Sequence, residues 1–338
     1  MVSKVIDSGS FPAAGADYIQ SINANSFDAI ALSLYRYQYA HNPFYQRFSD
    51  SLRRSPATVS RIEDIPFLPV SFFKSQRIRT GDPAEKPVLI FETSTTTGDT
   101  PGVHEVLDEA LYSEALMQGF RQFYGAPEQY AILALLPSYL ERKTSSLVHM
   151  ARVLMGAGGH PDNGFYLHDW ERLAATLQKL EAAGQPTILL GVTFALLDFA
   201  EAHPLSLRQT IVMETGGMKG RREEWTRAQV HDFLQARWAI KSIHAEYGMT
   251  EMLSQAYSSG QGIFRPSATM KVLLREMTDP LTLSATGSGC INIIDLANVH
   301  SCAFLATDDI GRAQADGRFE VLGRADFSAL RGCSLMSA

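Results

Sequence analysis

Apolar residues recur at the spacing of one helix face in several stretches of the chain. In the first stretch, Phe27, Ile30 and Leu34 fall on the same side of a helix, and we expect this helix to form an N-terminal cap. The pattern predicts helices at residues 26–54, 108–124, 145–155, 173–182, 194–201 and 223–236.

Short apolar runs separate most of these helices and favour buried strands. They predict strands at residues 88–92, 130–136, 187–190, 210–214 and 240–244. Strands that alternate with helices are typical of a parallel sheet covered by helices. Beyond residue 262 the runs are shorter and richer in Thr and Val, which predicts further strands at residues 269–274, 289–295 and 318–322.

These elements together predict an α/β fold of layered sheets with covering helices, plus a smaller β-rich subdomain. We expect a helical N-terminal cap at residues 1–64 and an α/β core at residues 65–262. The β-rich subdomain with a short C-terminal tail then occupies residues 263–338.

Composition narrows the classes of function. The chain has 338 residues, 45% of them hydrophobic, and a formal net charge of -6. A negative net charge offers no general attraction to nucleic acid or to an anionic membrane, so neither partner is expected. The first residues lack the apolar core of a secretory signal, and the apolar run at residues 187–200 is too short to span a bilayer. We therefore expect a cytoplasmic protein without a membrane span.

A hydroxyl-rich loop follows the predicted strand at residues 88–92. Its sequence runs through Thr93, Ser94, Thr95, Thr96 and Thr97 into glycines. Hydroxyls and backbone N–H groups in such a turn can hold phosphate oxygens. The loop differs from the Walker type because no lysine follows its glycines.

Two further segments combine residue types that suit nucleotide chemistry. Residues 247–251 place an aromatic ring, a hydroxyl and a carboxylate close together, which are groups that can stack on a purine, bind phosphate and hold Mg²⁺. Residues 305–312 carry paired acids before a glycine, a pattern more typical of a turn when it stands alone, and residues 323–326 follow a dozen positions later.

Taken in order, these segments resemble the core motifs of the acyl-adenylate-forming superfamily of acyl-CoA ligases, luciferases and peptide-synthetase adenylation domains. Within it the chain looks most like the acyl-protein synthetase type of the bacterial bioluminescence fatty-acid reductase complexes. Residues 72–75, 247–257 and 331–336 carry this narrower likeness, which extends over most of the chain from about residue 65.

The resemblance implies a role for each matching position. It assigns the ATP phosphates to the loop, Mg²⁺ to Glu251, the α-phosphate to Thr250, and adenine stacking to Tyr247, which Gly248 follows. It places Asp309 on the ribose hydroxyls with Arg324 near the same sugar. The loop residues are Thr93, Ser94, Thr95, Thr96, Thr97 and Gly98, and the segment against the adenine and acyl pocket is Gly216, Gly217 and Met218.

The chain also departs from the family pattern. Thr95 stands where a glycine is usual, and the closing lysine of the loop is missing, with His104 as a loose candidate for its place. The family's mobile C-terminal domain, which brings a catalytic lysine, is expected to be absent because only a short tail follows Asp326. Lys219, Arg324 and Arg331 are the cations that could replace that lysine.

The resemblance implies that a carboxylic acid, in this type a fatty acid, is activated with ATP and passed to a thiol. Cys333, five residues from the end, is the implied acceptor for delivery to a partner such as an acyl-CoA reductase, whereas Cys290 and Cys302 are expected in the core. Two alternatives stay open: a ligase for coenzyme A or a carrier protein, and a non-catalytic nucleotide-binding scaffold.

Overall fold

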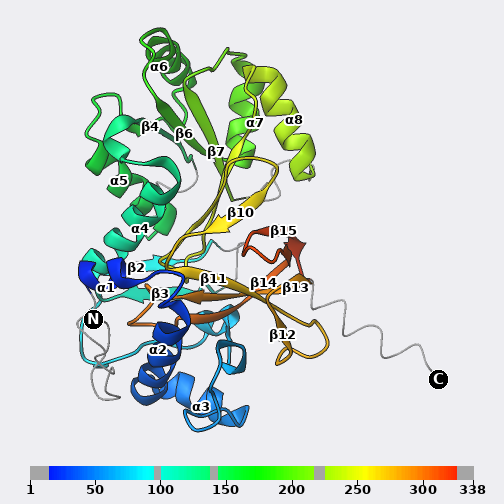
Figure 1. Cartoon of the computed structure of the whole chain (residues 1–338). Helices are drawn as coiled ribbons and strands as arrows, with labels where there is room; N and C mark the ends of the chain where they lie inside the picture. The colour runs from blue at the N-terminus through cyan, green and yellow to red at the C-terminus, as the bar shows by residue number, and fades with distance from the viewer. Residues whose placement is uncertain (1–14, 95–99, 138–143, 217–224, 326–338) are drawn as a thin grey trace, which may run out of the picture. The chain divides into compact units, whose positions relative to one another are not determined.

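A computed structural model describes residues 15–94, 100–137, 144–216 and 225–325. The chain divides into two compact units (Figure 1). The middle unit comprises Pro87–Ser267, and the terminal unit joins Met1–Lys86 with Ala268–Ala338. Within the described residues, no helix is both long and apolar enough to cross a membrane.

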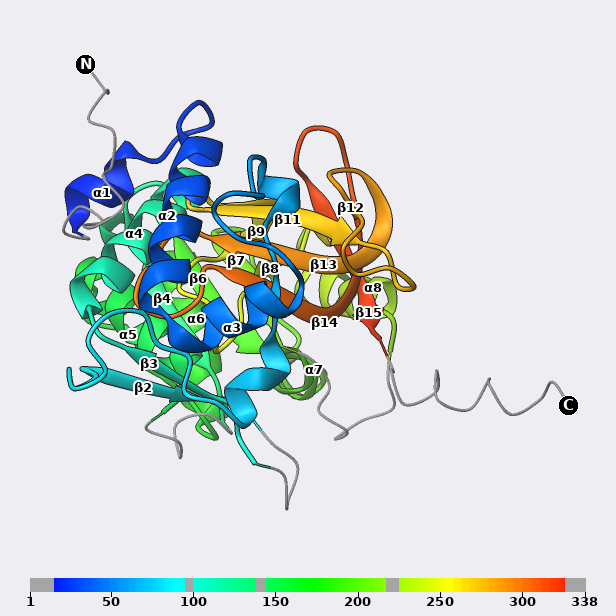
Figure 2. The ribbon, with the colours of Figure 1, turned by 90° about the horizontal axis from the view of Figure 1, so that it is seen from below.

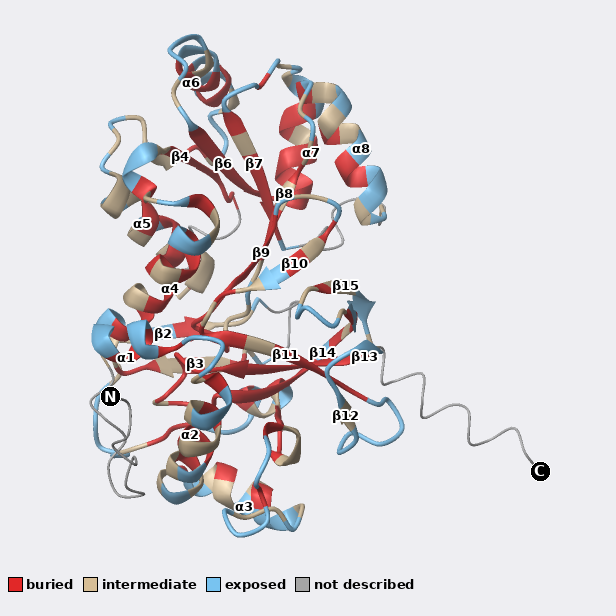
Figure 3. Cartoon of the chain, in the orientation of Figure 1, coloured by how far each residue is buried: buried red, intermediate tan, exposed pale blue. Residues whose placement is uncertain are grey.

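The middle unit is built on one mixed sheet. Its strands are β4 (Ala131–Leu135), β5 (Gly164–Phe165), β6 (Thr187–Val192), β7 (Thr210–Thr215), β8 (His244–Tyr247), β9 (Ala256–Ser258) and β10 (Ile263–Pro266). They lie in the order β5, β4, β6, β7, β8, β9, β10, parallel as far as β8 and antiparallel from there. Every residue of β4 and β6 is buried, as expected for parallel strands that are covered on both faces (Figure 3).

Helices cover this sheet, with α4 and α5 on one side of β4, β6 and β7 and with α7 and α8 on the other (Figure 1). The helices are α4 (Glu109–Tyr124), α5 (Ser146–Gly158), α6 (Trp170–Ala182), α7 (Thr193–Ala202) and α8 (Arg227–Trp238). Several begin where a polar side chain accepts a hydrogen bond from the first turn; Asp108 does so for α4 and Ser145 for α5. A separate hairpin pairs β2 (Leu89–Glu92) with β3 (Val103–Val106).

The terminal unit holds an antiparallel sheet. Its strands are β11 (Met270–Arg275), β12 (Leu283–Ser284), β13 (Gly287–Asp295), β14 (Phe304–Ala313) and β15 (Phe319–Arg324), in the order β12, β11, β13, β14, β15, and β1 (Leu68–Pro69) runs parallel to β14. Its helices are α1 (Ala16–Ser21), α2 (Phe27–His41) and α3 (Pro43–Ser51), with short 3₁₀ turns at Ile62–Asp64 and Val70–Lys74. Figure 2 shows α2 and α3 across the strands β13 and β14.

Long-range contacts explain why the first and last parts of the chain form one unit. Gln38 of α2 donates hydrogen bonds to the carbonyls of Asn298 and Val299, at 2.8 and 3.0 Å. The ring of Tyr45 stacks on Phe304, with 6.0 Å between centroids. The sequence divided the chain after residues 64 and 262, whereas these contacts place the N-terminal helices and the C-terminal strands together.

The predicted fold class is confirmed, and several elements need correction. The helix predicted over residues 26–54 is two helices, because Asn42 is extended and caps the second one, which begins at Pro43. The segment around Thr307 and Asp309 is not a turn but the middle of β14, where Asp309 pairs with Arg324 of β15 and where the pairing with β13 is regular on either side of residues 307–309. The strand predicted at residues 240–244 runs from His244 to Tyr247 instead.

Candidate functional site

The neck of the hydroxyl-rich loop is closed by two hydrogen bonds between the residue that follows β2 and the residue that precedes β3. The backbone N–H of Thr93 donates to the carbonyl of Gly102 at 2.9 Å, and the N–H of Gly102 donates to Thr93 Oγ1 at 2.7 Å. Ser94 is exposed just beyond this neck. Thr95, Thr96, Thr97 and Gly98 lie outside the described residues. The two residues at the base of the loop, Thr93 and Gly102, are therefore held together.

Glu251 reaches this neck from a segment far along the chain. A Cβ placed on Gly102 would lie 3.2 Å from Thr93 Cγ2 and 3.4 Å from Glu251 Oε1. A side chain at this position would therefore be in tight contact with Thr93, which the glycine avoids. Glu251 is buried, with 5% of its surface exposed. The fold thus brings a threonine hydroxyl and a carboxylate of two separate sequence motifs to one place.

His104 of β3 connects this hairpin to the segment that carries Thr250 and Glu251. Its Nδ1 lies 2.8 Å from the carbonyl oxygen of Thr250, and the residue is buried. This contact fixes the turn that carries Thr250 and Glu251 against β3. His104 therefore has a structural contact within the site. The sequence had offered it as a candidate for the place of the missing loop lysine, which would face phosphate.

Tyr247 ends β8 at the carboxyl edge of the parallel strands. Its ring is half-buried and lies 5.8 Å, between centroids, from the ring of Phe264. Gly248 follows, and a Cβ on it would lie 2.4 Å from Oε1 of Glu246, so no larger residue fits without movement. In open α/β sheets ligands bind outside this edge.

Glu246 joins the ends of β7 and β8 inside the unit. The hydroxyl of Thr215 donates to Glu246 Oε2 at 2.6 Å, directly before Gly216, whose φ is +73°. Burial raises the pKa of Glu246 from 4.5 to about 7, against the smaller lowering effect of the Thr215 hydrogen bond. Gly217 and Met218, predicted with Gly216 to face adenine, lie outside the described residues.

A second carboxylate, Glu214, lies on the opposite face of β7, because neighbouring side chains of a strand alternate. Its Oε1 lies 3.1 Å from Nε2 of His231 and 3.7 Å from Nε of Arg227. The hydroxyl of Thr193, the first residue of α7, donates to Glu214 Oε2 at 3.4 Å. Sequence reasoning missed this cluster. The signal that could have found it is the position of Glu214 at the end of a predicted strand.

Asp309 and Arg324 belong to the terminal unit. They lie opposite each other on β14 and β15, with 3.5 Å between Arg324 Nε and Asp309 Oδ1. Asp309 is 8% exposed, whereas 78% of the Arg324 side-chain surface is accessible. The guanidinium of Arg324 is open to solvent, so this ion pair contributes little to stability.

The cysteines separate into two groups. Cys290 and Cys302 are buried in the terminal unit, as the sequence predicted. Burial raises the pKa of the Cys302 thiol to about 12, which makes it a poor nucleophile. Cys333 lies outside the described residues, as do two of the candidate cations, Lys219 and Arg331.

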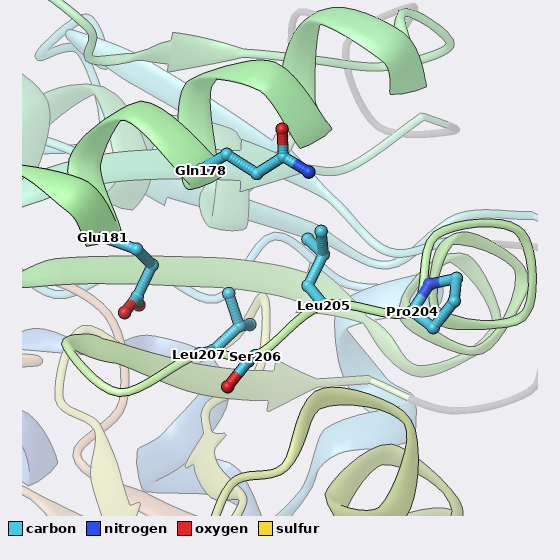
Figure 4. Close-up of a pocket in the computed structure, with 6 residues that line it drawn as sticks. All are labelled: Gln178, Glu181, Pro204, Leu205, Ser206 and Leu207. Atoms are coloured by element: carbon cyan, nitrogen blue, oxygen red, sulfur yellow. The ribbon is translucent and has the colours of Figure 1, made fainter.

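An open pocket of about 460 Å³ lies near the amino ends of the parallel strands β6 and β7 (Figure 4). It is lined by Gln178, Glu181, Pro204, Leu205, Ser206 and Leu207. The Glu181 carboxylate accepts hydrogen bonds from the N–H groups of Arg208 and Gln209 and from the Thr210 hydroxyl. The Glu181 carboxylate therefore holds the segment at the start of β7 in place.

The residues at the loop neck fit a magnesium nucleotide. Hydroxyl and carboxylate oxygens are the donors that Mg²⁺ prefers, and it is usually held by one or two carboxylates together with substrate phosphates. Glu251 beside Thr93 supplies such a carboxylate. Among the described residues no group of three or more His, Cys, Asp or Glu side chains gathers as a metal cage.

No protein-family model matches the chain, and no curated protein matches its sequence. Solved structures do. A 2-hydroxyisobutyryl-CoA ligase in complex with 2-HIB-AMP and CoA is similar over 95% of this chain and 74% of its own, with a TM-score of 0.68 and 14% identity. The chain has the fold of an acyl-CoA ligase.

Two further ligases resemble the chain more distantly. ATP-bound MatB from Rhodopseudomonas palustris matches 72% of the chain at 17% identity, with a TM-score of 0.52. A long-chain-fatty-acid-CoA ligase from Archaeoglobus fulgidus matches 74% at 18% identity, with a TM-score of 0.51. The chain matches 49% of the MatB length and 54% of the second ligase. At these identities the likeness concerns the fold.

Proposed function

We propose that the protein activates a carboxylic acid with ATP to form an acyl-adenylate. The observation that supports this most is the neck of the hydroxyl-rich loop, where Thr93, Gly102 and the buried Glu251 meet. A phosphate-binding turn beside a carboxylate suits a magnesium nucleotide. The fold shared with acyl-CoA ligases adds an independent reason to choose acid activation.

In the proposed reaction a carboxylate oxygen attacks the α-phosphorus of ATP, the bond to the β-phosphate oxygen breaks, and pyrophosphate leaves. Thr250 contacts the α-phosphate, and the ring of Tyr247 stacks on adenine. Asp309 accepts hydrogen bonds from the ribose hydroxyls, with Arg324 beside the sugar. Mg²⁺ held by Glu251 would neutralise charge on the phosphates as a Lewis acid. The chain thus supplies orientation and charge stabilisation.

The acyl group then passes to a thiol. A thiolate attacks the acyl carbon, a thioester forms, and AMP leaves with the oxygen that linked it to the acyl group. We propose the thiol of Cys333 as acceptor, a fatty acid as substrate, and an acyl-CoA reductase as the partner that receives the chain. The narrower resemblance to acyl-protein synthetases, at residues 72–75, 247–257 and 331–336, supports this choice.

A free thiol ligand is the second candidate acceptor. The 2-hydroxyisobutyryl-CoA ligase that shares the fold was solved with CoA, so coenzyme A or a carrier-protein phosphopantetheine is a direct alternative to Cys333. Both versions share the adenylation step. They differ only in which sulfur attacks the adenylate.

Two assays test these steps in order. Exchange of labelled pyrophosphate into ATP should require Mg²⁺ and a carboxylic acid, and Glu251→Gln should reduce it by about a hundredfold or more. Folded wild-type protein that supports no exchange with any of a broad set of acids would point to a nucleotide-binding scaffold instead.

The acceptor is tested by incubation with labelled fatty acid and ATP. Protein-bound label that hydroxylamine removes should disappear in Cys333→Ser and persist in the matched control Cys290→Ser, whose thiol is buried. With coenzyme A added, acyl-CoA formation by Cys333→Ser at the wild-type rate, without protein labelling in either form, would favour the ligase alternative.

A further inference from the structure

The pairing of β14 with β13 is irregular where Asp309 lies. Cys290 of β13 pairs with Ile310 of β14, and Asn292 pairs with Ala306. The single residue Ile291 therefore faces three residues, 307–309, which form a bulge in the pairing of these two strands. Bulges re-aim side chains and are over-represented next to active sites. On the β13 side its backbone groups lack regular strand partners, so other contacts must satisfy them there, whereas Asp309 still pairs with Arg324 of β15.

Arg275, the last residue of β11, is buried and donates hydrogen bonds to both strands at the bulge. One guanidinium nitrogen, Nη1, donates to the carbonyl of Ile291 at 3.1 Å and to Oδ1 of Asn292 at 2.7 Å. The other, Nη2, donates to the carbonyl of Thr307 at 2.5 Å. The fork therefore spans both sides of the bulge, Ile291 on β13 and Thr307 on β14.

Thr307 connects Arg275 to Asp309. Its side chain is fully buried, and its hydroxyl donates to the carbonyl of Ile291 at 2.9 Å. The same oxygen accepts a hydrogen bond from the backbone N–H of Asp309 at 3.1 Å. Position and direction of the Asp309 side chain thus depend on a continuous chain of contacts that begins at Arg275.

Burying a guanidinium is costly unless its donors are satisfied, and an apolar residue would pack into a sheet more cheaply. Arg275 is only 9% exposed and spends its donors on the backbone and side chain around the bulge. A lysine offers a single point charge and could not bridge the two strands in the same way.

We propose that Arg275 is a positioning residue that sets the Asp309 carboxylate for the sugar of the bound nucleotide, and so determines selectivity for ribose over deoxyribose. This inference rests on the proposed function, which assigns the ribose hydroxyls to Asp309. Arg275 acts through Thr307 and does not itself touch the nucleotide.

The test compares dissociation constants of the full chain for ATP, 2′-deoxyATP and 3′-deoxyATP with Mg²⁺, measured by isothermal titration calorimetry. Loss of a hydrogen bond to a carboxylate weakens wild-type binding of a deoxy analogue by about tenfold or more. In Arg275→Lys and Arg275→Met this ratio should fall to about one to threefold, mainly through weaker ATP binding. Arg312→Met, an exposed arginine on β14 that contacts Ser288, is the matched control and should keep the wild-type ratio.

A second pair of variants keeps the test independent of Arg275 folding. Thr307→Val removes the hydroxyl at nearly constant shape and should lose the ribose preference, whereas Thr307→Ser keeps the hydroxyl and should retain it. A purely structural role would weaken ATP and both deoxy analogues by the same factor. Equal weakening, or an unchanged ratio in Arg275→Lys and Thr307→Val, overturns the inference. Absence of ATP binding by the wild type would instead overturn the proposed function.

Discussion

Glu246 offers a sharp test of how the middle unit is built, because its carboxyl group is buried between the ends of two strands. The perturbation is Glu246→Gln, which keeps the shape and the hydrogen bond from the Thr215 hydroxyl but removes the ionisable group. Raising the folded-state pKa above the unfolded value means that the protonated form favours folding. The stability that protonation provides is complete below pH 4.5 and is lost as the pH rises through about 7.

The magnitude follows from the two pKa values. A shift from 4.5 to about 7 corresponds to about 3 kcal/mol at about 1.4 kcal/mol per pKa unit. Glu246→Gln stays neutral at every pH, so its stability relative to the wild type should increase by about 2–3 kcal/mol between pH 5 and about pH 8. Subtracting one protein from the other removes the titration of the neighbouring His244, whereas Tyr124 and Tyr257, whose pKa values burial and Glu246 raise above 10, stay protonated in this pH range.

Urea unfolding followed by tryptophan fluorescence measures this difference. All three tryptophans, Trp170, Trp225 and Trp238, belong to the middle unit, so the signal reports on the unit that contains Glu246. A difference between the two proteins that stays constant with pH would refute the reasoning. A variant that becomes less stable than the wild type as the pH rises would show that the carboxylate is held as an anion.

Three further substitutions probe the site and the fold. Gly248→Ala should cost about 1–3 kcal/mol of unfolding free energy because its Cβ meets Glu246 Oε1, and the added substitution Glu246→Ala should relieve that cost in a double-mutant cycle. Thr93→Val leaves the N–H of Gly102 without its acceptor and should cost about 1–3 kcal/mol and slow pyrophosphate exchange, whereas Thr93→Ser should do neither; denaturation and exchange assays on the same samples decide. Asn42→Ala removes the cap of α3 and two buried hydrogen bonds and should lower stability by about 2–4 kcal/mol, with nucleotide affinity unchanged.

The central strands and helices could be predicted because their sequence carries the information locally. β4 and β6 are continuous apolar runs, and α4 begins at a side-chain cap that Asp108 provides. β14 could not be predicted in the same way. Asp308, Asp309 and Gly311 have the composition of a turn, and only the neighbouring strands β13 and β15 make that segment extended. Tertiary pairing there overrides local preference.

The candidate site shows the same division. Thr93 and Glu251 stood out as members of two separate motifs, but their meeting at Gly102 depends on a fold that brings distant segments together. Glu246 and the Glu214–His231 pair gave no signal beyond lying near strand ends. The role of a buried titratable side chain is inferred from the residues that it contacts. Where those residues are far apart in the chain, only the folded structure shows the contact.

The adenylation step itself can be followed by the fate of one oxygen atom. The acid that best supports pyrophosphate exchange is labelled with ¹⁸O in its carboxylate and incubated with ATP, Mg²⁺ and the acceptor thiol, and the nucleotide product is examined by mass spectrometry. Attack of the carboxylate on the α-phosphorus predicts AMP that carries one ¹⁸O atom and pyrophosphate that carries none. Unlabelled AMP, or ADP as the nucleotide product, would contradict acid activation at this site.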